Sequence, residues 1–221
     1  MKFTTTETLV RMLEILRGEY PKWHAPIVTF VAVSHGSPFE VLVSTVLSLR
    51  TKDDCTRGAV ERLFAKARTP EGILTLSEME IEKLIYPVGF YKTKARNLLS
   101  ISSLILTKHG GQVPDDIDTL LELPGVGRKT ANLVVTLGFG KPGICVDTHV
   151  HRISNRWGYV ETKTPEETEF ALRKKLPAEW WIPYNDILVA FGQTICHPTS
   201  PWCSKCPVSM DCRRIGVARS R

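Results

Sequence analysis

The stretch of sequence that decides the fold is LELPGVGRKTAN at residues 121–132. A helical pattern ends near Leu123, a Pro-Gly-Val-Gly turn interrupts it, and a second helical pattern begins near Arg128. Glycines permit positive φ and let backbone N–H groups come close to a ligand, and the next helix adds unpaired N–H groups and the positive end of its dipole. We expect this turn to cradle a phosphate through Gly125, Val126, Gly127 and Arg128. A plain link between antiparallel helices is the alternative.

Helical patterns continue along the rest of the chain. Apolar residues at helical spacing, with breaks at Gly and Pro, predict helices over residues 5–18, 38–50, 52–66, 70–74, 77–86, 91–108, 115–122, 148–157, 165–175 and 183–194. The connection from residue 19 to residue 36 is expected to be irregular. Alternating strand patterns and internal repeats are missing from the sequence, so the predicted fold class is all-α.

Composition and charge are those of a soluble globular protein. The 221 residues are 43% hydrophobic and 24% charged, enough for one large domain or two small ones. The net charge of +6 suits a polyanionic partner such as nucleic acid, although a basic protein need not bind one. The first twenty residues have helical periodicity rather than a continuous apolar run, so we expect no signal peptide, no membrane segment and an intracellular, cytoplasmic location.

Four of the six cysteines lie within seventeen residues near the C-terminus, with the spacing C-x6-C-x2-C-x5-C. These are Cys196, Cys203, Cys206 and Cys212. Four thiolates can hold zinc or a [4Fe–4S] cluster. Structural zinc usually takes two C-x-x-C pairs, and only one is present here. Cys55 and Cys145 lie outside the array and are expected to be small core residues.

These motifs together resemble the endonuclease III family of helix–hairpin–helix DNA glycosylases. The resemblance covers nearly the whole chain after residue 30. It rests on the cysteine array and on LPGVGRKTAN at 123–132, VDTHVHRISNR at 146–156, SPFEVLVSTVLSLRTKD at 37–53 and VGFYKTKARNL at 88–98. It implies a two-lobed all-α fold with a C-terminal [4Fe–4S] loop. The expected lobes are a six-helix lobe at 31–141 and a discontinuous lobe of residues 1–30 plus 142–221.

The resemblance also implies a catalytic pair, Lys129 and Asp147. Base removal with strand cleavage needs a neutral amine that attacks C1′ of the sugar. Because an ordinary Lys has a pKa of about 10.4, the helix N-terminus and Arg128 would have to lower it. A carboxylate then stabilises the cationic sugar. By themselves, a helical Lys is usually a solvated charge and an Asp before a helix is usually a cap.

Family members that only remove the base typically lack a Lys at the position of Lys129. The resemblance therefore implies a bifunctional glycosylase and AP lyase that removes damaged, chiefly oxidised, pyrimidines from duplex DNA. Its expected partner is double-stranded DNA with damaged bases or abasic sites, bound by a monomer at the nucleoid. The DNA should lie between the lobes, with Lys129 facing Asp147. The alternatives are a mismatch-specific glycosylase and a non-catalytic iron–sulfur protein that binds DNA or senses redox state.

Base excision requires the target nucleotide to leave the helical stack. In the family, two loops fill the gap, and they correspond here to Arg50 and Phe90. A Gln is common at the first position and an aliphatic residue at the second, so the preferred lesion stays open. Phe90 packed in the core is the alternative. Lys205, Arg213 and Arg214, at the cysteine array, are expected to contact the DNA backbone.

His149 and His151 follow Asp147 closely. A spacing of two residues places them on different sides of a helix, so we expect them to pack rather than to share a metal ion.

Overall fold

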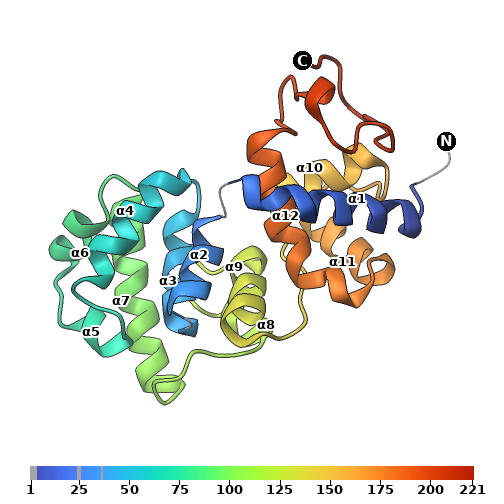
Figure 1. The fold of residues 1–221 in the computed structure, drawn as a ribbon. Coiled ribbons are helices and arrows are strands. Elements are labelled where there is room, and N and C mark those ends of the chain that lie inside the picture. The colour runs from blue at the N-terminus through green and yellow to red at the C-terminus, as the bar shows by residue number, and fades with distance from the viewer. Residues whose placement is uncertain (1–3, 24–25, 36) are drawn as a thin grey trace. The chain divides into compact units, whose positions relative to one another are not determined.

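The computed structural model describes residues 4–23, 26–35 and 37–221, which form helices and connecting loops without any strand (Figure 1). The predicted all-α fold class is confirmed. The α-helices are α1 (Thr6–Glu19), α2 (Ile27–His35), α3 (Pro38–Ser48), α4 (Asp53–Phe64), α5 (Pro70–Leu74), α6 (Glu78–Ile85), α7 (Tyr91–Lys108), α8 (Ile117–Leu121), α9 (Arg128–Leu133), α10 (Thr148–Trp157), α11 (Pro165–Lys175) and α12 (Trp181–Thr194). Shorter helical segments are η1 (Tyr20–Lys22), η2 (Val134–Gly138), η3 (Ala178–Trp180) and η4 (Cys203–Lys205).

Local capping explains why the predicted helices begin close to where the sequence places them. The clearest case is α6, where the Ser77 side chain accepts a hydrogen bond from the backbone N–H of Glu80 and the Glu80 carboxylate accepts one from the N–H of Ser77. This reciprocal pair satisfies two N–H groups that the helix leaves without partners. Ser37 also occupies an N-cap position, but its side chain makes no capping hydrogen bond.

The connection expected to be irregular up to residue 36 contains α2, which the sequence reading missed. Its sequence, IVTFVAVSH, is rich in β-branched residues and lacks a polar face, so it has little local helical signal. Ile27, Val28 and Val31 are buried, and α2 packs against α3 and α4. Burial against these helices outweighs the weak propensity.

The chain divides into two compact units, and residues 27–143 form one of them. Within the described residues this unit contains the helices from α2 to α9 and the segment η2. The sequence predicts a six-helix lobe over residues 31–141 in this part of the chain. Its centre is α3, in which every side chain from Phe39 to Leu47 is buried. Helices α2, α4, α7 and α9 pack around α3. A largely apolar helix that is buried on all sides has to be enclosed in this way.

The second unit combines residues 1–26 with residues 144–221. Helix α1 packs against α12, and its buried residues Leu9, Met12, Leu13 and Leu16 join a core with the side chains of α10, α11 and α12 (Figure 1). The N-terminal segment is thus part of the same fold as the C-terminal third. Among the described residues, no helix is both long and apolar enough to cross a lipid bilayer.

Candidate catalytic residues, DNA-contact loops and cysteine pocket

The predicted hairpin is formed by α8, a tight turn and α9. Asp116 caps α8 by accepting a hydrogen bond from Thr119 N–H at 2.9 Å. The buried side chains of Leu123 and Val126 anchor the turn, and Val126 N–H donates to Leu123 O at 3.1 Å. Gly127 is the N-cap of α9. The turn therefore holds the start of α9 rigidly against the core, as a phosphate cradle requires.

The two glycines of the turn differ in whether the surrounding protein requires them. Gly125 has a φ of +78°, and a Cβ atom there would collide with the Asn97 side chain of α7. Gly127 has an ordinary φ of −105°, and a Cβ atom there would meet nothing within 4 Å. The protein itself therefore requires glycine at Gly125 but not at Gly127. The close approach of an external ligand would explain the second glycine.

Gly127→Ala should weaken DNA binding about tenfold while leaving the fold intact, because the added methyl group meets a phosphate and no protein atom. The free energy of unfolding should change by less than about 1 kcal/mol, since Ala tolerates this φ and is only a poorer N-cap. Titration with duplex DNA and thermal unfolding measure the two effects. Gly125→Ala is the comparison and should destabilise the protein by about 1–3 kcal/mol through backbone strain. Unchanged DNA affinity in Gly127→Ala would argue against the cradle.

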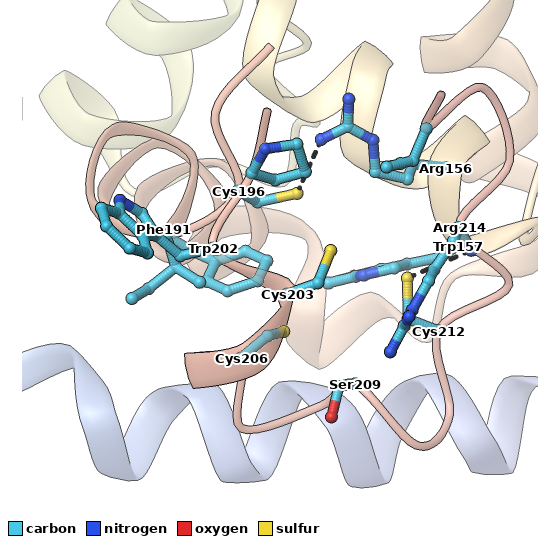
Figure 2. Close-up of a pocket in the computed structure, with 13 residues that line it drawn as sticks. Arg156, Trp157, Phe191, Cys196, Trp202, Cys203, Cys206, Ser209, Cys212 and Arg214 are labelled. Carbon is cyan, nitrogen blue, oxygen red and sulfur yellow. Dashed lines mark hydrogen bonds between the residues drawn. The ribbon is translucent and has the colours of Figure 1, made fainter. Parts of the chain in front are cut away.

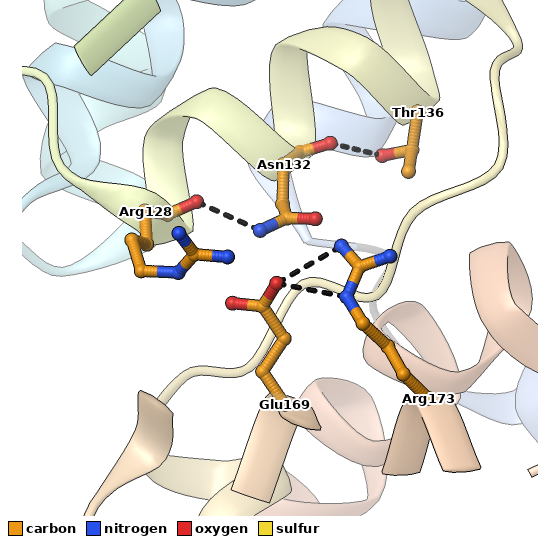
Figure 3. Close-up of polar contacts among 5 residues, drawn as sticks. All are labelled: Arg128, Asn132, Thr136, Glu169 and Arg173. Atoms are coloured by element: carbon orange, nitrogen blue, oxygen red, sulfur yellow. Dashed lines mark hydrogen bonds and ion pairs between the residues drawn. The ribbon is translucent and has the colours of Figure 1, made fainter. Parts of the chain in front are cut away.

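Lys129 is the second residue of α9 and is half-buried. Helix α9 continues directly into the π-helical segment η2. In this region Asn132 donates to the carbonyl of Arg128 at 3.1 Å, and Thr136 donates to the carbonyl of Asn132 at 2.8 Å (Figure 3). These side-chain bonds hold the helical backbone that carries Lys129. A π-helical turn inside a helix is frequent at functional sites.

Asp147 lies in the other unit, at the N-cap of α10. Its Oδ1 accepts hydrogen bonds from the backbone N–H groups of His149 at 2.8 Å and Val150 at 2.9 Å. The preceding residues Ile144, Cys145 and Val146 are buried, and Asn185 of α12 donates to Cys145 O at 3.2 Å. The Asp147 carboxylate is therefore held in one orientation by its own helix and by the buried segment of residues 144–146 that precedes it.

The four clustered cysteines line one pocket, which Figure 2 shows. Cys196 follows α12 and is buried, with its N–H bonded to Phe191 O at 2.9 Å. Cys203 is the first residue of η4, Cys206 directly follows η4, and Cys212 lies six residues further on. Trp157, Phe191 and Trp202 form part of the same wall. None of the six cysteines forms a disulfide bond.

Hydrogen-bond donors point at two of these sulfur atoms. The buried Arg156 of α10 donates from Nη1 to Cys196 Sγ at 3.1 Å (Figure 2). The same nitrogen donates to His197 O at 2.9 Å. The backbone N–H of Arg214 donates to Cys212 Sγ at 3.4 Å. Donors of this kind stabilise thiolates more than thiols, as ligation of iron requires.

Burial has the opposite effect on the thiols. It raises the pKa of Cys196 and Cys212, and raises that of Cys206 to about 12. Thiolates in this pocket therefore need a cation to compensate their charge, as the irons of a cluster would. Within the described ranges, no three Cys, His, Asp or Glu side chains converge on a single metal-ion position. The donor set fits an iron–sulfur group in its chemistry and its shared pocket.

Arg50 and Phe90 lie together in the unit of residues 27–143, although forty residues separate them in the sequence. The Arg50 guanidinium carbon lies 5.7 Å from the centre of the Phe90 ring. Both backbones are left-handed, with φ values of +53° and +58°. The Phe90 side chain is 62% exposed, which excludes the alternative of a core aromatic residue. Left-handed backbone at a non-glycine residue is uncommon and clusters at functional sites.

Sequence reading missed Lys94, the residue beneath this pair. Lys94 is only 6% exposed, and burial lowers its pKa to about 8. A buried Lys is rare unless it is well paired. The sequence signal was the position of Lys94 among buried helix residues, four residues after Phe90. A second missed group is the Glu169–Arg173 ion pair of α11 at 2.9 Å, in which the carboxylate is buried (Figure 3).

The remaining candidates contact different parts of the structure. Lys205 is exposed and its Nζ lies 4.6 Å from the centre of the Trp202 ring, whereas the aliphatic part of Arg213 packs beside Gly158. His149 contacts Arg152 at 3.1 Å and His151 contacts Thr168 at 2.7 Å, so the two imidazoles have different partners. Outside the array, Cys145 is buried and Cys55 is half-buried.

Comparison with known proteins decides the family. The profile of HhH-GPD superfamily base excision DNA repair proteins matches residues 43–178. The chain is 50% identical over 187 residues to endonuclease III of Thermotoga maritima, a match that covers 83% of this chain and 88% of that protein. The chain belongs to the endonuclease III family.

Solved structures agree with this placement. The endonuclease III family chain is similar to a trapped endonuclease III–DNA covalent intermediate, with a TM-score of 0.84, 37% identity and coverage of 95% of this chain and 96% of that one. It is also similar to a thermostable thymine-DNA glycosylase, with a TM-score of 0.72, 25% identity and coverage of 90% and 95%. The expected helix–hairpin–helix glycosylase fold is confirmed.

Proposed function

We propose that this endonuclease III family protein is a bifunctional DNA glycosylase and AP lyase of base excision repair, which removes damaged, chiefly oxidised, pyrimidines from duplex DNA. The observation that carries the proposal is the anchored hairpin that presents Lys129 at the start of α9, beside a glycine that the protein's own packing does not require. The match to endonuclease III over most of both chains supports the same activity.

In the proposed reaction, the neutral amine of Lys129 attacks C1′ of the damaged nucleotide. The bond from C1′ to the base breaks, and the base leaves with the bonding electrons and takes up a proton. The nitrogen, now bonded to C1′, loses one proton, and the bond from C1′ to the ring oxygen breaks as that oxygen takes up a proton, which leaves a protonated imine between Lys129 and C1′. Loss of a proton from C2′ then breaks the bond from C3′ to its phosphate, which is β-elimination. Water finally releases Lys129. Covalent catalysis of this kind divides one difficult step into easier ones.

Asp147 is the proposed partner carboxylate. Its Oδ1 accepts two backbone hydrogen bonds at the start of α10, and these bonds hold the group in place. A fixed carboxylate stabilises positive charge that develops on the sugar as the base leaves, and it assists the proton transfers of the later steps.

DNA binding is proposed to combine three elements. The hairpin residues Gly125, Val126, Gly127 and Arg128 bind phosphate through backbone N–H groups, which reads no sequence and suits a search along all DNA. Arg50 and Phe90 occupy the space that the extruded nucleotide leaves. Lys205 and Arg213 contact the DNA backbone. One bound lesion needs one chain, so we propose a monomer that acts at the nucleoid in the cytoplasm.

Cys196, Cys203, Cys206 and Cys212 are the proposed ligands of a [4Fe–4S] cluster. When bound, the cluster supplies cross-links between four points of the C-terminal segment and positive charge that compensates the thiolates. The residues of this chain keep Cys196 in place from α10: Arg156 bonds its sulfur, and Arg152 donates to its carbonyl at 2.8 Å.

Cys203→Ser should abolish cluster binding, because a serine hydroxyl is a poor substitute for a thiolate ligand. The native chain should carry about four irons and four sulfides with the broad visible absorption of such a cluster, and the variant should lose both. Cys55→Ser, outside the array, is the matched control and should keep its iron. Metal analysis that finds one zinc ion in the native chain would overturn the assignment.

Borohydride trapping tests the proposed activity. The native chain, mixed with a duplex that contains one abasic site, should form a covalent adduct when borohydride reduces the imine. The same chain should release oxidised pyrimidines from a panel of duplexes. Release of thymine opposite guanine, without release of oxidised pyrimidines, would favour the mismatch glycosylase. The likeness to a thymine-DNA glycosylase is the observation that favours this second candidate. The absence of any adduct or base release would favour the non-catalytic alternative.

A further inference from the structure

Lys94 is a buried cation that bonds to the loop carrying Arg50. Its Nζ donates hydrogen bonds to Leu47 O at 2.8 Å, to Leu49 O at 2.7 Å and to Thr51 Oγ1 at 3.1 Å. Three acceptors match the three N–H groups of an ammonium. The two carbonyls belong to the C-terminal end of α3, where helices leave carbonyl groups without partners and where a cation is favoured. Lys94 therefore fixes the chain on both sides of Arg50.

The same residue is bonded to the loop carrying Phe90. The backbone N–H of Lys94 donates to Phe90 O at 3.0 Å, which closes the first turn of α7. Thr51 Oγ1, which accepts from Lys94, also accepts from Gly89 N–H at 3.1 Å. A Cβ atom on Gly89 would lie 2.8 Å from Arg50 O, so the two loops touch through their backbones. Lys94 and Thr51 are the polar link between them.

The left-handed backbone of Arg50 and of Phe90 is unfavourable by itself and persists only where the surroundings hold it. Lys94 bonds to Leu49 and Thr51, the residues directly before and after Arg50. Thr51 bonds to Gly89, the residue directly before Phe90. These bonds are therefore placed to hold both residues in these conformations and to keep the guanidinium beside the ring.

We infer that Lys94 is a positioning residue for nucleotide extrusion, which ties the Arg50 and Phe90 loops into one preformed wedge. The inference rests on the proposed function, because it takes Arg50 and Phe90 as the residues that replace the extruded nucleotide. Lys94 itself acts from beneath the loops and does not touch DNA. A wedge held rigid before binding loses less conformational freedom when it enters the stack.

The test compares two substrates under single-turnover conditions: a duplex with thymine glycol paired to adenine, and a single strand with an abasic site. Extrusion from a paired stack is needed for the first only. Lys94→Met should lower the ratio of the two rates at least about tenfold, as Phe90→Ala and Arg50→Ala should. In the double variant with Phe90→Ala, the loss should not exceed the larger single loss, because both changes disable one unit. When Lys94→Met binds, the fluorescence of a 2-aminopurine placed beside the lesion should rise less than when the native chain binds.

Leu98→Ala is the control for lost stability, since Leu98 is fully buried on α7 one turn beyond Lys94. It should lower both rates alike and leave their ratio unchanged. If Lys94→Met does not fold, Thr51→Val removes the shared acceptor more gently and should lower the ratio about threefold. The inference fails if the Lys94 or Thr51 variant keeps the native ratio, or if Phe90→Ala and Arg50→Ala keep it while Lys94→Met does not. A native chain that neither traps nor excises would instead refute the proposed function.

Discussion

Replacing Lys129 with alanine should abolish the borohydride-trapped adduct and lower strand cleavage at an abasic site by at least about 10³-fold. Alanine has no nucleophile that can form an imine, and β-elimination depends on that imine. The change should cost little stability, because Lys129 is half-buried on the first turn of α9 and alanine is the best helix former. Gel analysis of the reduced mixture and thermal unfolding measure the two effects.

Lys108→Ala is the matched control for this experiment. Lys108 is an exposed residue at the end of α7, in the same unit as Lys129. This variant should trap and cleave like the native chain. A Lys129→Ala protein that still forms the adduct and cuts the strand would show that another amine is the nucleophile, and the central assignment would be wrong.

Asp147→Asn should reduce base release from a damaged duplex by about 10²–10⁴-fold while the fold is retained. Asparagine has the same shape and is as good an N-cap as aspartate, so the bonds to the N–H groups of His149 and Val150 can persist. What is lost is the negative charge that stabilises the cationic sugar. The melting temperature should stay within a few degrees of the native value, and single-turnover base release should show the full loss.

The chain contains its own control for this substitution. Asp116 caps α8 through the same type of bond, from the N–H of Thr119 to its carboxylate. Asp116→Asn removes the charge of a capping aspartate in the hairpin unit, and base release should change by no more than about threefold. Equal losses in the two variants would mean that Asp147 serves only as a helix cap.

The helices could be predicted because their signals are local. Three helices begin at local caps in the structure, and their starts lie within two residues of the predicted positions 77, 165 and 115. The caps are Ser77 with Glu80, Thr164 before Pro165 and Asp116 before α8. Apolar spacing predicted helices over residues 5–18 and 91–108 for the same reason, close to the observed bounds of α1 and α7. Helix α2 was missed because its helical state comes from burial against α3 and α4, which no window of sequence contains.

The candidate site likewise contains residues that local motifs predict and features that only tertiary contacts reveal. Lys129, Asp147 and the cysteine spacing stand in contiguous motifs, and a family resemblance transfers them position by position. Arg50 and Phe90 were named from that resemblance, but their contact and their left-handed backbones are tertiary facts. The helical position of Lys94 indicates burial, but its bonds to the Arg50 loop could not be predicted, since its three acceptors lie 43 to 47 residues earlier in the chain.

The sequence by itself determined the all-α class, the hairpin with its lysine, the helix-capping aspartate and the set of four thiols, because each is written in neighbouring residues. The tertiary structure decided that the protein's own packing does not need Gly127, how Arg156 reaches Cys196, and which buried cation joins the two proposed DNA-contact loops. Those facts depend on which helices pack together. Packing is set by the burial of apolar surface over the whole chain. Because this free energy depends on residues that are distant in the sequence, no single motif predicts it.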